Sequence, residues 1–370
     1  MRSNILLFIS LFAIVSSCRD DVVKINEEHF NGTAIDSLSL SRLYLLNEGN
    51  MGSNKASLDA FDFMSGTYTR SYWKFQNPTS SQSLGDVGND IIRYGSHLWL
   101  AINCSNLIEI TDLDAHHVSS VEVPNCRFLA SHDGYVYCTS YAGPVSFEID
   151  KAQYGLVYKI DTLNYSVVAT CQVGYQPDGI AILNDTIYVA NSGGYLGASS
   201  ADLYENTISV IPISSFSVSE TISVAPNLNL IQSHDPSQSL FVNSRGDYAG
   251  SPSALYHITK NNSTYDIQLV AEHCSNFSVS DSLVFIINSD SKSSCQVYDI
   301  YQKKSDTVSL PFNMQCPYGI CKLPHTDIVC LTDAKDYVSP GTLYMYNYKS
   351  REIINTFITG DIPAHFCLVY

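Results

Sequence analysis

Loops rich in tyrosine, asparagine, serine and glycine are the part of this sequence whose side chains could act on a ligand. Tyrosine offers a rigid ring with a polar tip at low entropy cost, and asparagine, serine and arginine make hydrogen bonds. The candidate ligand-binding residues are Asn103, Arg127, Tyr141, Tyr175, Asn191, Tyr195, Tyr204, Arg245, Tyr248 and Tyr318. Any single tyrosine among them could equally be loop packing, whereas the whole set favours recognition of a ligand.

Catalytic and metal-binding patterns are missing from the sequence. It has no G-x-S-x-G elbow, no Walker phosphate loop and no H-E-x-x-H motif. His116 and His117 are adjacent, so a regular strand cannot point both at one metal, and a solvated turn is the better interpretation. Asp247, Asp333 and Asp336 match no EF-hand spacing and are expected to be exposed loop acids. We therefore expect no enzymatic activity, no metal and no catalytic cofactor.

The charge balance restricts the partners. Lysine and arginine number 20 against 36 aspartates and glutamates, which gives a formal net charge of −16. Nucleic acid binding requires a basic surface, so no nucleic-acid partner is expected. No internal run of about 18 apolar residues occurs, so nothing after the N-terminal leader is expected to span a membrane.

The N-terminus is typical of an exported lipoprotein. Arg2 supplies the positive start, residues 5–15 supply the apolar core, and Val-Ser-Ser-Cys at 15–18 resembles a bacterial lipobox. Residues 1–17 are therefore predicted to be a lipoprotein signal peptide, with Cys18 lipidated and 18–38 a tether. An ordinary signal peptide with a chance cysteine is the alternative.

Acidic residues follow the predicted lipidated cysteine. Asp20 and Asp21 resemble the surface-export signal of Bacteroidetes lipoproteins. We expect a protein held in the outer membrane by its lipid anchor only and exposed at the cell surface.

A repeated pair of strands organises the rest of the chain. Its clearest copy has a short apolar strand at 179–183, a turn at Asn184-Asp185 and a β-branched and aromatic strand at 186–190. Similar pairs recur every 40 to 50 residues or so, as in propeller blades. Their first strands fall at 89–94, 125–131, 227–233, 274–280 and 317–323, and their second strands at 97–103, 135–141, 239–245, 283–289 and 327–333. In the blade of the clearest copy, 207–213 and 218–224 are the expected third and fourth strands.

The two ends of the chain complete the count. Residues 42–47 form a second strand with no first strand before it, and 58–63 and 67–74 are expected to follow as strands. Residues 362–370 form a first strand with nothing after it. The C-terminal strand is therefore predicted to complete the N-terminal blade, giving an all-β, seven-bladed propeller of four-stranded blades over 39–370.

Ten cysteines remain after Cys18. Cys104 and Cys126 are expected on one face in adjacent blades, so a disulfide between them is possible, and Cys274 with Cys295 is a weaker candidate pair. The cysteines within strands are expected to be small core residues, namely Cys138, Cys330 and Cys367.

The repeat resembles the YVTN-type propeller repeat. More specifically, several segments resemble the surface lipoprotein propellers of gut Bacteroidetes that capture cobalamin. They are YLLNEGNMGSNKASLD (44–59), LGDVGNDI (84–91), INCSN (102–106), PNCR (124–127), TSYAGPV (139–145) and GYQPDGIAILNDTIYVANSGGY (174–195). The resemblance implies binding of vitamin B12 and related corrinoids, without chemistry on them, and delivery to an outer-membrane TonB-dependent transporter. The loops at 288–294 and 332–341 depart from the family pattern and could retune which corrinoid is preferred.

Two other functions remain open at this point. Loops of tyrosine, asparagine and glycine also suit a glycan- or protein-binding surface propeller. A propeller lyase or lactonase would need histidines and carboxylates clustered at the axial channel, and the sequence gives no sign of such a set.

Overall fold

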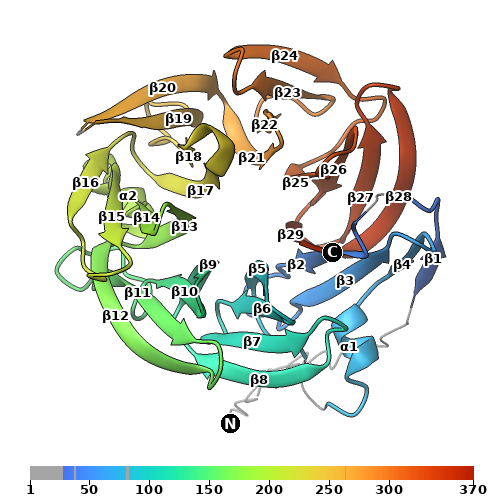
Figure 1. The fold of residues 1–370 in the computed structure, drawn as a ribbon, viewed down its shortest axis with the longest axis horizontal. Coiled ribbons are helices and arrows are strands. Elements are labelled where there is room, and N and C mark those ends of the chain that lie inside the picture. Colours follow the sequence, from blue (N-terminus) through green and yellow to red (C-terminus); the bar gives the residue numbers. More distant parts are fainter. Residues whose placement is uncertain (1–27, 37–38, 81–82, 263) are drawn as a thin grey trace, which may run out of the picture.

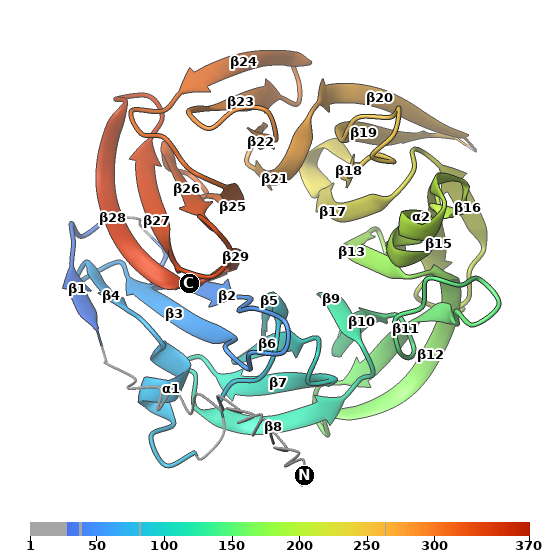
Figure 2. The ribbon, with the colours of Figure 1, turned by 180° about the vertical axis from the view of Figure 1, so that it is seen from behind.

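A computed structural model describes residues 28–36, 39–80, 83–262 and 264–370. The predicted signal peptide, Cys18 and the first part of the predicted tether lie outside these residues. Seven sheets stand around a central axis as the blades of a propeller (Figures 1 and 2), which confirms the predicted all-β architecture.

Each blade has four main antiparallel strands, ordered here from the axis outward. Blade 1 consists of β29 (Pro363–Val369), β2 (Arg42–Asn47), β3 (Ser57–Asp62) and β4 (Thr67–Thr69); blade 2 of β5 (Gly88–Tyr94), β6 (His97–Ile102), β7 (Leu107–Asp112) and β8 (His117–Glu122); blade 3 of β9 (Cys126–His132), β10 (Tyr135–Ser140), β11 (Tyr154–Asp161) and β12 (Ser166–Tyr175). Blade 4 consists of β13 (Pro177–Leu183), β14 (Thr186–Asn191), β15 (Thr207–Pro212) and β16 (Glu220–Ser223); blade 5 of β17 (Leu228–His234), β18 (Ser239–Ser244), β19 (Ala254–Asn261) and β20 (Thr264–Glu272). Blade 6 consists of β21 (Cys274–Ser280), β22 (Leu283–Asn288), β23 (Ser294–Asp299) and β24 (Lys304–Ser309); blade 7 of β25 (Pro317–Lys322), β26 (Ile328–Asp333), β27 (Pro340–Asn347) and β28 (Glu352–Asp361).

The C-terminal strand closes the ring. β29 pairs antiparallel with β2 and places Phe366 opposite Leu45, as predicted. The backbone N–H of Glu48 donates to the carbonyl oxygen of Ile362 at 2.9 Å and extends this pairing at one end. Pairing of the two chain ends leaves no open blade in the ring.

The core lies between neighbouring blades. The second strands are almost fully buried because a blade covers each of their faces, and all six residues of β18 and of β26 are buried. One such core joins Leu46 and Leu58 of blade 1 to Leu98 and Leu100 of blade 2. Burial of these apolar side chains is what holds adjacent blades together.

Short helices interrupt the sheet pattern. The strand expected over 67–74 ends at Thr69, and the helix α1 (Tyr72–Gln76) follows it. Ser71 adopts a left-handed conformation, and its N–H donates to Asp59 Oδ1 at 2.8 Å, so the chain turns away from the blade. The aromatic residues of this segment suggested a strand, but Tyr72 and Trp73 pack in the core shared by blades 1 and 2. The other helical segments are α2 (Gly194–Ser199), η1 (Ala201–Leu203) and η2 (Asp235–Ser237).

No helix in the described part of the chain has both the length and the hydropathy that crossing a bilayer demands.

The propeller begins before the expected boundary at residue 39. β1 (His29–Asn31) adds a fifth strand to blade 1 and pairs with β4, with Phe30 opposite Tyr68. The side-chain amide of Asn355 accepts from the N–H of Thr33 at 2.6 Å and donates to its carbonyl at 2.9 Å. The described part of the predicted tether is therefore docked on blades 1 and 7.

Every cysteine in the described ranges is a free thiol. The proposed Cys104–Cys126 disulfide is wrong, and so is the weaker pairing of Cys274 with Cys295. Cys126 is fully buried, and its Sγ lies 3.3 Å from the carbonyl oxygen of Leu107, so the side chain points into the core between blades 2 and 3. Burial raises the pKa of its thiol to about 12. The expected core cysteines, Cys138, Cys330 and Cys367, are buried.

A neutral histidine is buried in blade 5. The ring of His257 stacks on Phe241 with centroids 4.4 Å apart, and its Nε2 atom has no hydrogen-bond partner in the described structure. Burial lowers its pKa from 6.5 to about 4, and Lys303 and His234 add to this effect. Folding therefore disfavours the charged form of this ring.

Removing β29 should open the ring. We expect deletion of residues 363–370 to abolish the cooperative unfolding transition, because the second strand of blade 1 would lose its inner partner. Calorimetry and near-UV circular dichroism measure this. Deletion of Tyr370 alone, which is exposed and follows β29, is the matched control and should leave the melting temperature unchanged. A cooperative transition in the longer deletion would contradict closure by β29.

His257 should make stability depend on acidic pH. The folded pKa lies below the unfolded one, so the unfolded chain binds the extra proton and stability is lost as pH falls from about 6.5 to about 4. We expect this group to lower the free energy of unfolding by up to about 3 kcal/mol over that window. Urea titrations at several pH values should show a shallower pH dependence in His257→Gln. The control is His273→Gln, an exposed position with no ion pair among the described residues, and it should keep the wild-type slope.

Candidate functional site

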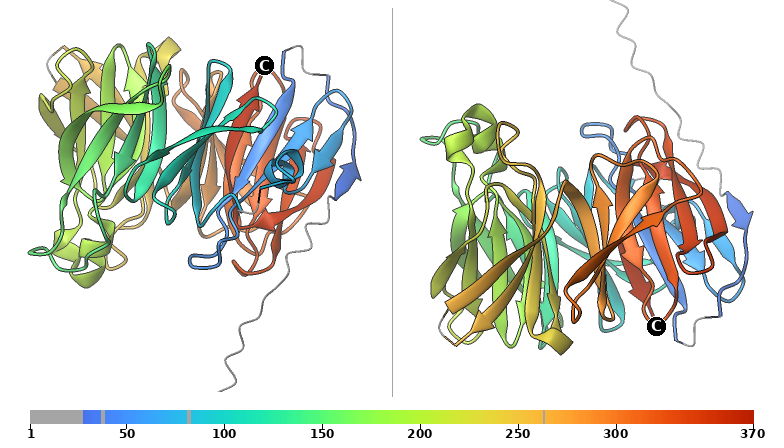
Figure 3. Two further views of the ribbon diagram at one scale, coloured as in Figure 1. Left: turned by 90° about the horizontal axis from the view of Figure 1, so that it is seen from below. Right: turned by 90° about the horizontal axis from the view of Figure 1, so that it is seen from above.

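One face of the disc carries the longer loops. Loops between second and third strands, and the connections from one blade to the next, share this face, which we call the loop face. Figure 3 shows α2 and the loop after β2 projecting from the face opposite to the C-terminus. The sequence predicted that these two kinds of segment would lie together.

Residues in the blade connections hold the loops of blades 3, 4 and 5 in place. Asn125, Gln176 and Asn227 each adopt a positive φ, of 46°, 48° and 57°. Their side-chain amides donate to loop carbonyls, namely those of Gly143, Ser146 and Gly246, at 3.1, 2.9 and 3.1 Å. Sequence reasoning missed these residues, although a proline lies next to each of them and marks the connection.

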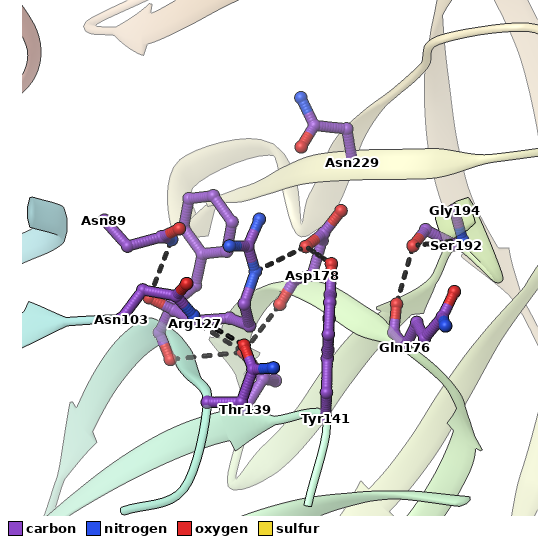
Figure 4. Close-up of polar contacts among 12 residues, drawn as sticks. Asn89, Asn103, Arg127, Thr139, Tyr141, Gln176, Asp178, Ser192, Gly194 and Asn229 are labelled. Carbon is purple, nitrogen blue, oxygen red and sulfur yellow. Dashed lines mark hydrogen bonds and ion pairs between the residues drawn. The ribbon is translucent and has the colours of Figure 1, made fainter. Parts of the chain in front are cut away.

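Asp178 is the centre of the polar network on this face (Figure 4). Its Oδ1 accepts from Nε of Arg127 at 2.9 Å and from the hydroxyl of Tyr141 at 2.9 Å, and its Oδ2 accepts from Nη1 of Arg245 at 2.7 Å. Nη2 of Arg245 also donates to Oδ1 of Asn229 at 2.7 Å. Side chains from blades 3, 4 and 5 are thus joined by one carboxylate.

The electrostatics of this network favour the ionised carboxylate. Asp178 is fully buried, and burial alone would raise its pKa, but Arg127 and Arg245 outweigh that effect and hold the pKa below its usual value. The guanidinium of Arg127 also lies over the ring of Tyr141, 4.9 Å from its centroid. Sequence reasoning missed Asp178 because the surrounding Pro-Asp-Gly is also an ordinary turn sequence.

A second cluster of polar side chains lies near the axis, where blades 7 and 1 meet. The hydroxyl of Tyr318 is 3.1 Å from both carboxylate oxygens of Glu48, and Nε2 of His365 is 3.2 Å from Glu48 Oε1. Asp90 and His365 line the axial cavity of about 510 Å³ between the innermost strands. Burial raises the pKa of Asp90, and His365 opposes that rise. In the described ranges, the axial region thus holds one histidine, His365, with the carboxylates of Glu48 and Asp90 near it.

Two of the candidate amides support the fold. Asn103 and Asn191 are buried, with exposures of 7% and 1%. Nδ2 of Asn103 donates to Asn125 Oδ1 at 2.7 Å and to the carbonyl of Cys126 at 2.8 Å. Nδ2 of Asn191 donates to hydroxyls of Thr207 at 3.0 Å and Ser209 at 2.9 Å. Both amides are used within the protein, so they do not line the loop face.

The candidate tyrosines pack in pairs. Tyr195, at the start of α2, contacts the rings of Tyr141 and Phe147 edge-on, with centroids 6.2 and 5.5 Å away. Tyr204 lies 6.5 Å from Tyr248, whose side chain is 77% exposed. Tyr175 ends the outermost strand of blade 3, where it stacks on Tyr154 at 4.3 Å, away from the Asp178 network.

A pocket opens beside the network. It has a volume of about 620 Å³, and Arg245, Tyr248, Ser251, Ser253 and Ser275 are among the residues that line it. The structure thus brings Arg127, Tyr141, Tyr195 and Arg245 to the network. Tyr248 lines the pocket and Tyr204 lies beside Tyr248, whereas Tyr318 is on the opposite side of the axis.

Metal ligands do not gather in this part of the molecule. Across the described ranges, no group of three or more His, Cys, Asp and Glu side chains is placed to hold a metal ion. Asp333, expected as an exposed loop acid, is buried and accepts from the N–H groups of Gln315 and Cys316 at 2.9 and 2.8 Å.

Comparison with known proteins defines the class of the fold. No protein-family model and no curated protein matches this chain. A hypothetical selenium-binding protein of Sulfolobus tokodaii is similar with a TM-score of 0.65 and 12% identity, covering 90% of this chain and 94% of that chain. Hydrazine synthase of Kuenenia stuttgartiensis is similar with a TM-score of 0.59 and 14% identity, covering 76% of this chain and 89% of that chain. AztD of Citrobacter koseri is similar with a TM-score of 0.51 and 10% identity, covering 90% of this chain and 98% of that chain. These likenesses concern the fold alone, and the strand order makes this chain a seven-bladed β-propeller.

Neutralising Asp178 should destabilise the protein. In Asp178→Asn the two arginines would lose their shared counter-ion, and breaking a buried pair costs about 3–5 kcal/mol. We expect a lower free energy of unfolding by that order in chemical denaturation. Asp202→Asn, an exposed acid in the neighbouring loop, should change it by less than about 0.5 kcal/mol. Equal stability of Asp178→Asn and wild type would contradict the central role of this carboxylate.

Proposed function

We propose that this protein is a non-catalytic, surface-exposed lipoprotein that captures cobalamin and related corrinoids. It then delivers them to a TonB-dependent transporter in the outer membrane. The observation that supports this most is a set of contacts on the loop face. Three of the segments that resemble the cobalamin-capturing propellers, 124–127, 139–145 and 174–195, are joined there through Arg127, Tyr141 and Asp178.

The chemistry of the loop face suits a corrinoid. A corrinoid is large, roughly flat and edged with amide groups, so it needs a broad surface with rings and hydrogen-bonding groups. Exposed rings on this face include Phe147, Tyr248 and Tyr337, which are 54%, 77% and 44% exposed. They can cover apolar parts of the ligand while the loop backbone and serines pair with its amides.

The loops are also held in a fixed arrangement. Oε1 of Gln176 accepts from the N–H of Tyr195 at 2.7 Å and from that of Leu196 at 3.1 Å, which fixes the start of α2. A surface that is ordered before binding loses less entropy when the ligand arrives. This favours tight capture over loose adsorption.

An enzyme is the second candidate, and one observation favours it. Glu48 and Tyr318 contact each other beside the axial cavity, and His365, which lines that cavity, lies 3.2 Å from Glu48. An acid and a histidine are therefore paired near the place where a propeller lyase or lactonase would need them. We rank the enzyme second because the Glu48 carboxylate is already engaged by Tyr318 and His365 and is therefore not free to act on a substrate. Turnover that is lost on chelation of a retained divalent metal would reverse the ranking.

Titration with cyanocobalamin tests the proposal. We expect saturable binding below micromolar ligand, and a Tyr248→Ala variant that binds at least about tenfold more weakly with an unchanged melting temperature. Tyr301→Ala is the matched control, since Tyr301 is exposed in a turn on the opposite face. No binding by the wild type at micromolar ligand would remove the proposal and leave a glycan- or protein-binding propeller. Co-purification of a TonB-dependent transporter from outer membranes tests delivery.

A further inference from the structure

The Asp178 network contains more positive than negative charge. Arg127 and Arg245 both pair with the single carboxylate of Asp178, so two positive charges face one negative charge. Among the described residues, neither arginine pairs with a second carboxylate, and the two terminal nitrogens of Arg127 make no hydrogen bond. These three side chains together thus carry one net positive charge, in a chain whose formal charge is −16.

Nearby carboxylates are already occupied. Oδ1 of Asp247 accepts three backbone N–H groups of its own loop, from Ala249, Gly250 and Ser251, at 2.9, 2.8 and 2.8 Å. Glu48 accepts from Tyr318 and lies 3.2 Å from Nε2 of His365. These contacts hold both carboxylates to other partners, so among the described residues neither forms an ion pair with Arg127 or Arg245.

The excess charge is accessible from the pocket. The side chains of Arg127 and Arg245 are 16% and 34% exposed, and Arg245 lines the 620 Å³ pocket with Ser251, Ser253 and Ser275. A guanidinium presents donors in a planar fork, and the hydroxyl of Ser253 adds a further donor. This combination matches the oxygens of a phosphate group or a carboxylate rather than a neutral amide.

We propose that the Arg127–Asp178–Arg245 network and its pocket form an anion subsite that receives the phosphodiester of the bound ligand. This inference rests on the proposed corrinoid function. The peripheral groups of the corrin ring are neutral amides, whereas the nucleotide arm of a complete cobalamin carries one phosphodiester with a single negative charge. That charge equals the net charge of the network, so the phosphodiester is the group that the subsite selects.

Two ligands and two variants of Arg245, with one control variant, test the subsite. Cyanocobalamin carries the phosphodiester, and dicyanocobinamide has the same corrin ring without it. We expect the wild type to prefer cyanocobalamin by at least about tenfold, the size of one charge-assisted hydrogen bond, and the preference to shrink with added salt. In Arg245→Gln the preference should fall below about threefold, whereas Arg245→Lys should keep part of it. Arg42→Gln is the matched control, because Arg42 pairs with Asp114 at the other end of blade 1.

The outcomes separate this inference from the proposed function. If the wild type binds both corrinoids with equal affinity, or if Arg245→Gln keeps the full preference while remaining folded by circular dichroism, the subsite is disproved and corrinoid capture stands. If the wild type binds neither corrinoid, the proposed function fails and the inference fails with it. A preference that disappears in Arg245→Gln but persists in Arg42→Gln supports the subsite.

Discussion

Pairing of β29 with β2 is the constraint on which the rest of the structure depends. Each blade buries its two faces against its neighbours, so a ring with a missing inner strand would expose two apolar faces to water. The pairing also determines which groups meet at the axis. Glu48 and His365 are separated by 317 residues in the sequence and come within 3.2 Å only because the ends of the chain join. Closure therefore determines both the core and the polar groups at the channel.

Contacts between neighbouring blades near the axis transmit this constraint to the loop face. The hydroxyl of Thr139, in blade 3, donates to the carbonyl of Asp178 in blade 4 at 2.7 Å, and that of Thr332 makes the equivalent bond to Pro363 at 2.6 Å. Gly179 lies against the backbone of β17, where a Cβ atom would overlap Asn229 and Ile231. The residue before this glycine is Asp178, so the close approach of blades 4 and 5 also fixes the carboxylate that both arginines share.

The repeat was predictable because its signal is local and recurs in every blade. Short apolar and β-branched segments bounded by turn residues predicted the strand pairs, and the unpaired strands at the two ends predicted the closure of the ring. Segments whose structure depends on distant partners were not predictable. Tyr72 and Trp73 have side chains typical of strands, yet they lie in a helix that packs on blades 1 and 2. Asn31 belongs to an edge strand that was not expected and that pairs with β4. The loop face was predicted as a set of rings and arginines. The carboxylate that joins them was missed, since its position beside Arg127 and Arg245 arises only when three blades assemble.

The asparagines show why repetition in a sequence is ambiguous evidence for a site. Asn47, Asn191 and Asn288 all end second strands, and all three are buried. A residue type that recurs at one place in many blades serves a need that every blade shares, such as satisfying backbone groups where a strand ends. A ligand contacts the blades unequally, so its binding residues should break the repeat. Asp178, Arg127 and Arg245 do break it, because only blades 3 to 5 supply them, and this asymmetry is the reason to place the ligand over these blades rather than evenly around the axis.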